Sequence, residues 1–72
     1  MPLNLVDLGV SYTIQKVCGT ELQRHHLKSL GFVQGETVTL LTRLHGYSVA
    51  LVKGSRIGLS DLFAKLIIVS FC

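Results

Sequence analysis

Hydrophobic residues in this chain occur in short runs, and glycines separate the runs. Within most runs apolar and polar residues alternate, which is typical of strands that bury one face. We expect strands over residues 12–18, 37–42, 47–52, 56–58 and 66–71. The last run is apolar on both faces, so we expect it to be a central, well-covered strand. Short strands with closely spaced turns predict a mainly β fold, a small barrel of about five strands.

Irregularities in the pattern add detail to this prediction. The first strand loses its alternation after Ile14, because Val17 is out of step, and we expect a β-bulge near residues 15–16. His45–Gly46 predicts a hairpin tip, since histidine tolerates positive φ better than most residues. A short helical turn is expected over about residues 60–64, with the serine at its start as the cap.

Residues 20–30 have the period of an α-helix instead. Thr20 and Gln23 predict a capping box, in which each side chain bonds the backbone N–H of the other residue. Gly31 is well placed to follow the helix, because glycine adopts a left-handed conformation at little cost. Phe32 can then make the hydrophobic contact that closes such an end.

This helix has two different faces. The face expected to pack on the barrel carries Leu22, Gln23, His26, Leu27 and Leu30. The opposite face is basic, with Arg24, His25 and Lys28. Such a face is either simply solvated or docks an acidic region of a partner, whose association the charges would speed and orient.

The composition is that of one folded domain. The chain has 72 residues, of which 49% are hydrophobic and 15% charged. These values fit a single domain over residues 1–72 and exclude a disordered polar tail. The longest apolar run is residues 66–69, whereas a membrane helix needs about 20 residues. We therefore expect no membrane insertion, and no signal peptide is visible.

The two cysteines, Cys18 and Cys72, do not form a C-x-x-C motif. Small secreted domains usually carry more cysteines, so we expect reduced thiols in a cytoplasmic protein, with a Cys18–Cys72 disulfide as the alternative. The net charge of +3 permits an acidic protein, a phosphate or an anionic membrane surface as partner.

The sequence shows no recognisable set of catalytic residues. The four carboxylates are far apart along the chain, so no acid–base pair can be proposed: Asp7, Glu21, Glu36 and Asp61. The glycine-rich segments lack the spacing of a phosphate-binding loop. We expect a protein that is not an enzyme and does not itself bind GTP.

Candidate metal ligands are His25, His45 and Cys18, which suit iron(II) or zinc. His25 and His26 are adjacent, about 100° apart on a helix, so they do not face one ion together. The expectation is a protein without a resident cofactor, and direct binding of iron(II) or zinc is the alternative.

Four stretches match a known family in order and spacing. They are residues 2–9 (Pro-Leu-x-Leu-x-x-Leu-Gly), 27–38 (Leu-x-x-Leu-Gly-Phe-x-x-Gly-x-x-Val), 54–59 (Gly-x-x-Ile-Gly-Leu) and 64–69 (Ala-x-x-Ile-x-Val). In these stretches the chain resembles the FeoA family of ferrous iron transport proteins. It departs from the family in having Gln34 where proline is frequent, a short hairpin at residues 44–46, and Ser60 where a basic residue often stands.

The resemblance implies an SH3-like barrel and a cytoplasmic accessory protein of the membrane permease FeoB, which carries a GTP-hydrolysing domain. Similar domains also form the C-terminal part of some metal-dependent repressors, but this chain has no room for their DNA-binding part.

The leading hypothesis is a non-enzymatic regulator that binds the cytoplasmic part of FeoB through Arg24, His25 and Lys28. A direct metal-binding sensor is the second hypothesis. A small basic barrel that binds nucleic acid is the third, and it is disfavoured because the five aromatic residues do not interleave with the basic ones. Exposed strand edges would allow self-association.

Overall fold

The computed structural model describes residues 1–71, and Cys72 lies outside them. The elements in chain order are a 3₁₀ turn η1 (Leu3–Leu5), β1 (Ser11–Val17), α1 (Glu21–Ser29), β2 (Thr37–Leu44), β3 (Tyr47–Val52), β4 (Ser55–Ser60), α2 (Asp61–Ala64) and β5 (Ile67–Phe71). The five strands, the helix α1 and the short helical turn α2 confirm the mainly β prediction, and η1 is an additional turn that the sequence pattern does not predict. The proposed Cys18–Cys72 disulfide involves a residue outside the described range.

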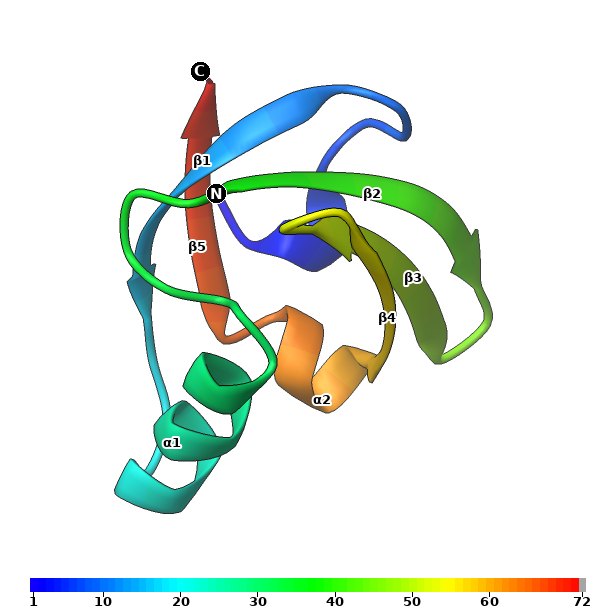
Figure 1. Cartoon of the computed structure of the whole chain (residues 1–72). Helices are drawn as coiled ribbons and strands as arrows, with labels where there is room; N and C mark the ends of the chain where they lie inside the picture. Colours follow the sequence, from blue (N-terminus) through cyan, green and yellow to red (C-terminus); the bar gives the residue numbers. More distant parts are fainter. Residues whose placement is uncertain (72) are drawn as a thin grey trace.

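The five strands form one antiparallel sheet in the order β4-β3-β2-β1-β5. Figure 1 shows the sheet curling around a single interior, with α1 below the end of β1 and α2 between β4 and β5. This is the small barrel that alternation and closely spaced turns predict.

β1 divides its hydrogen bonds between two neighbours. It pairs with β2 only over Ser11–Thr13, and with β5 from Tyr12 to Val17. The register with β5 shifts between Ile14 and Lys16, which confirms the predicted bulge. A bulge bends its strand and increases the local twist, so the second half of β1 turns away from β2.

β5 is not the central strand that its apolar sequence predicts. It is the last strand of the sheet, and only Ile67 and Val69 are fully buried on it. Its second edge is partly filled by Met1, which exchanges two backbone hydrogen bonds of 2.8 Å with Val69. An apolar run cannot distinguish a central strand from an edge strand that another segment covers, and this is why the prediction is wrong.

Both ends of α1 form as the sequence predicts. The Thr20 side chain accepts from the Gln23 backbone N–H, and the Gln23 side chain accepts from the Thr20 N–H. At the other end, the Phe32 N–H donates to Leu27 and the Gly31 N–H to Lys28, both at 3.0 Å. This pair of bonds is a Schellman motif, and Gly31 has the positive φ of 106° that it needs.

The predicted buried face of α1 is correct only near its C-terminal end. Leu27 is fully buried, whereas Leu22 is 83% exposed and His26 is also exposed. The His26 ring contacts Phe63 of α2, with centroids 5.1 Å apart. The helical period predicts one continuous apolar face, but it does not show how much of that face the barrel covers. Figure 1 shows the first turn of α1 extending away from the barrel, which agrees with the high exposure of Leu22.

The hairpin turns also differ in one respect from expectation. His45–Gly46 is the tip between β2 and β3, but His45 does not have positive φ; Gly46 carries it. Lys53 is the one non-glycine among residues 1–71 with positive φ, at 51°. With Gly54 it forms a two-residue loop of the type I′ kind, which suits the twist of paired strands.

Ser60 is at the N-cap of α2, but its side chain makes no capping hydrogen bond.

The core lies inside the curled sheet and is closed by η1, Leu27 of α1 and Ala64 of α2. Its buried apolar members are Leu3, Val6, Tyr12, Ile14, Leu27, Phe32, Val38, Leu40, Ala50, Val52, Leu59, Ala64, Ile67 and Val69. On β3 the inward face is Ser48, Ala50 and Val52. The bulkier residues Tyr47, Val49 and Leu51, which the apolar pattern groups as one face, lie on the other side of the strand, so the period of two is confirmed but the buried face is the opposite one.

Gly58 of β4 leaves room for the Tyr47 ring of β3. A Cβ at position 58 would overlap the Tyr47 hydroxyl and approach its Cζ to 2.7 Å. We expect Gly58→Ala to destabilise the fold by about 0.5–1.5 kcal/mol, because the half-exposed Tyr47 ring must turn out of its place over the strand. Urea denaturation would measure the change.

The control is the same substitution in a Tyr47→Ala background. There the added methyl meets no ring, and it should be neutral or stabilise by up to about 0.5 kcal/mol through reduced freedom of the unfolded chain. Equal destabilisation in both backgrounds would show that Tyr47 is not the reason for glycine at position 58.

Candidate functional site

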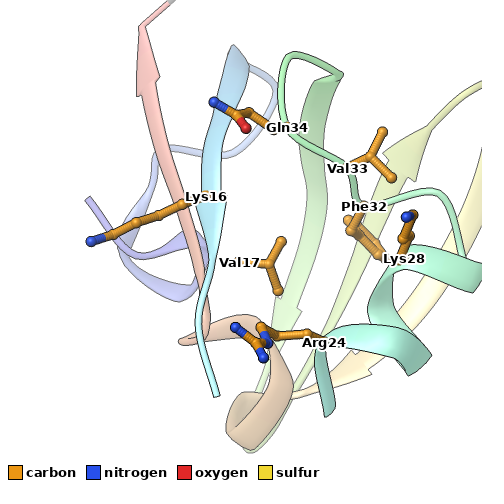
Figure 2. A pocket seen from close by; sticks show the side chains of 7 residues that line it. All are labelled: Lys16, Val17, Arg24, Lys28, Phe32, Val33 and Gln34. Carbon is orange, nitrogen blue, oxygen red and sulfur yellow. The ribbon is translucent and has the colours of Figure 1, made fainter. Parts of the chain in front are cut away.

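A groove of about 480 Å³ opens between β1, α1 and the loop that follows α1. Figure 2 shows the side chains that line it: Lys16, Val17, Arg24, Lys28, Phe32, Val33 and Gln34. The volume is within the range of roughly 300–1,000 Å³ that is usual for binding sites of small ligands.

The groove exists because β1 separates from β2. The last hydrogen bonds between β1 and the segment that leads into β2 run from the Ile14 N–H to the Glu36 carbonyl and from the Gly35 N–H to the Ile14 carbonyl. Beyond Ile14, β1 pairs with β5 alone, and no strand within residues 1–71 lies against its other edge. The bulge that the sequence predicts therefore marks the place where the site begins.

The floor of the groove is apolar. Phe32 is 1% exposed, and the Schellman motif at the end of α1 fixes its backbone. Val17 of β1 and Val33 of the loop are half-buried beside it. These side chains offer a surface that an apolar group can cover.

The rim of the groove is basic. Arg24 and Lys28 are four residues apart on α1 and therefore lie on one face of the helix, and Lys16 comes from the bulged part of β1. All three side chains are exposed. None of them forms an ion pair or hydrogen bond with another residue in the range 1–71. Their positive charges are therefore free to act on a partner.

The structure brings together two of the three residues predicted for partner binding. Arg24 and Lys28 line the groove, while His25 is exposed on α1 and does not line it. Sequence reasoning missed Lys16. The available signal was the expected bulge, because a bulge places consecutive residues outside the regular alternation, and both Gln15 and Lys16 are exposed.

The candidate metal ligands come from separate places. His25 lies on α1, His45 at the tip between β2 and β3, and Cys18 is half-buried after β1. Residues 1–71 contain no group of three or more histidine, cysteine or carboxylate side chains that could hold a metal ion. Metal binding by these residues stays a prediction.

Comparison with protein-family models matches residues 1–70 to the FeoA domain. The chain belongs to the FeoA family. The match covers nearly the whole described chain and confirms the resemblance seen in its motifs. Comparison with curated proteins gives no match. No helix within residues 1–71 has the length and apolar character to cross a membrane.

Solved structures place the fold among FeoA proteins and related domains. An iron uptake regulatory protein (FeoA) aligns with a TM-score of 0.89 and 24% identity, over 96% of this chain and 93% of that one. The Stenotrophomonas maltophilia FeoA, complexed with zinc, has a TM-score of 0.84 and 26% identity, over 97% and 89%. That protein is described as a prokaryotic SH3-domain protein, and a role as a ferrous iron transport activating factor is suggested for it.

A manganese-dependent transcriptional repressor in complex with manganese shares the fold at a TM-score of 0.91. The identity is 17%, and the match spans 99% of this FeoA chain but 36% of the repressor. This likeness concerns the fold alone. It agrees with the expectation that similar barrels form part of larger metal-dependent repressors.

The capping box holds the helix that carries two of the rim charges. We expect Thr20→Ala to lower the free energy of unfolding by about 1 kcal/mol, because the Gln23 N–H loses its acceptor at the start of α1. Chemical denaturation measures this loss. Thr20→Ser keeps the hydroxyl and should retain most of the stability; an equal loss in both variants would contradict the capping role.

Proposed function

We propose that this FeoA protein is a non-enzymatic, cytoplasmic accessory protein of ferrous iron uptake that binds the cytoplasmic part of a FeoB permease. The observation that carries the proposal is the groove with free positive charges in a member of this family. The role suggested for the Stenotrophomonas maltophilia protein supports the link to iron transport.

Binding rather than catalysis also agrees with where the carboxylates lie. Asp7 follows η1, Glu21 begins α1, Glu36 precedes β2 and Asp61 begins α2. They are thus dispersed over four parts of the fold, and the groove is lined by basic, apolar and amide side chains instead. A lining of this kind can hold an acidic partner, but it supplies no general base.

The proposed mechanism is regulatory. Free cations at the rim would accelerate and orient encounter with an acidic region of FeoB, because long-range attraction acts before contact is made. Once bound, the FeoA barrel would alter how FeoB couples GTP turnover to iron passage. Iron(II) is the cargo of the permease in this proposal and need not bind the barrel.

Calorimetry with the cytoplasmic domain of FeoB from the same organism tests the proposal, with and without a GTP analogue and iron(II). We expect saturable binding at micromolar affinity in at least one nucleotide state. The double variant Arg24→Glu/Lys28→Glu should weaken it at least tenfold, because two attractions become repulsions.

Arg56→Glu/Lys65→Glu is the matched control. It makes the same change in net charge, and both residues are exposed but do not line the groove. This variant should bind nearly as well as the original protein. No binding in any nucleotide state would contradict the proposed partner, and equal weakening by both variants would show that only overall charge matters.

A further inference from the structure

We infer that the groove takes an extended acidic segment of a protein, with an apolar side chain between its carboxylates. The inference rests on the proposed function in that the segment belongs to a protein partner of this FeoA chain. It goes further by stating the chemistry of the segment, by adding Lys16 to the contact residues and by leaving His25 out.

The spacing of the charges favours a segment over a single anion. In Figure 2 Arg24 and Lys28 extend from α1 at two separate places beside the cavity, while the Lys16 side chain runs from β1 away from it, so the three cations do not converge on one point. A site built for one phosphate would direct its donors to one point. Charges distributed around a rim suit carboxylates that are distributed along a chain.

The apolar floor calls for an apolar side chain at the centre of that segment. Val17 and Val33 are half-buried, so part of their surface stays in contact with water until something covers it. Burying such surface contributes roughly 25 cal/mol for each Å² removed from water. A purely acidic segment would leave this contribution unused, and the 480 Å³ volume has room for more than one side chain.

An extended conformation follows from the strand edge beside the groove. Past Ile14, β1 is paired with β5 on one side, and its other edge has no strand against it within residues 1–71. An open edge of this kind is what a bound peptide uses when it adds to a sheet. Gln34 stands on the opposite rim, exposed, with an amide that can both donate to and accept from a peptide backbone.

The direct test is a titration of the ¹⁵N-labelled full chain with a blocked pentapeptide, Glu-Asp-Leu-Glu-Asp, followed by amide chemical shifts. We expect the largest shifts at Val17, Val33 and Gln34, and affinity that falls as salt is raised. Two control peptides replace either all four acids by their amides or the leucine by serine. Each control should bind at least threefold more weakly.

Two variants locate the peptide. Lys16→Glu should weaken peptide binding at least threefold, and Val33→Ser should abolish the advantage of leucine over serine. Neither side chain is fully buried, so both variants should fold, whereas Phe32→Ala would remove a core side chain and cost about 3–5 kcal/mol. His25→Ala is the control on the same helix and should change nothing.

The inference is wrong if the peptide shifts no groove amide, or if both control peptides bind as tightly as the acidic peptide with leucine. It is also wrong if inorganic phosphate displaces the peptide when the two are present at equal concentration. These outcomes are separate from the test of the proposed function. FeoB binding without peptide binding would overturn only the inference. Peptide binding without FeoB binding would overturn only the identity of the partner.

Discussion

The structure depends on how β1 shares its two edges. A strand of seven residues has to join β2 at its start and β5 along most of its length, and the hydrogen bonds between Ile14 and the 35–36 loop are where the first partnership ends. The bulge after Ile14 makes this change of direction possible without breaking the ladder to β5. This irregularity leaves an opening beside α1, and together with a second register shift between Leu40 and Thr42 of β2 it adds to the curl of the sheet.

The groove is formed by two parts of the sequence, the helix α1 with the turn that ends it and the irregular part of β1. Its floor depends on the end of α1, where Gly31 reverses the chain and brings Phe32 under Leu27. Its rim depends on the helical spacing of Arg24 and Lys28 and on the irregular part of β1. Gln34 stands at the rim and carries an amide that can both donate and accept hydrogen bonds. The fold is shared with other FeoA proteins, while these individual positions set the charge and shape of the groove.

Local signals in the sequence predicted local structure well. The capping box of Thr20, the glycine end at Gly31 and the bulge near Lys16 each depend on a few neighbouring residues, and all three are present. Predictions that needed the position of a distant segment were less successful. The helical period predicts that Leu22 is buried because it does not show where the barrel ends, and the apolar sequence of β5 predicts a central strand because it gives no information about Met1. Arg24 and Lys28 were found from helical spacing, but their closeness to Lys16 depends on tertiary structure.

The pairing of Met1 with Val69 joins positions 68 residues apart in the chain. A ribosome that is still making β5 holds a chain whose sheet lacks its last strand, and whose first residues have no partner yet. Completion of the barrel must therefore wait until synthesis has passed the end of β5. Contacts between such distant positions slow folding, because a long loop must close before they are gained. Until β5 arrives, β1 lacks its longer strand pairing, and unpaired edges of this kind favour aggregation.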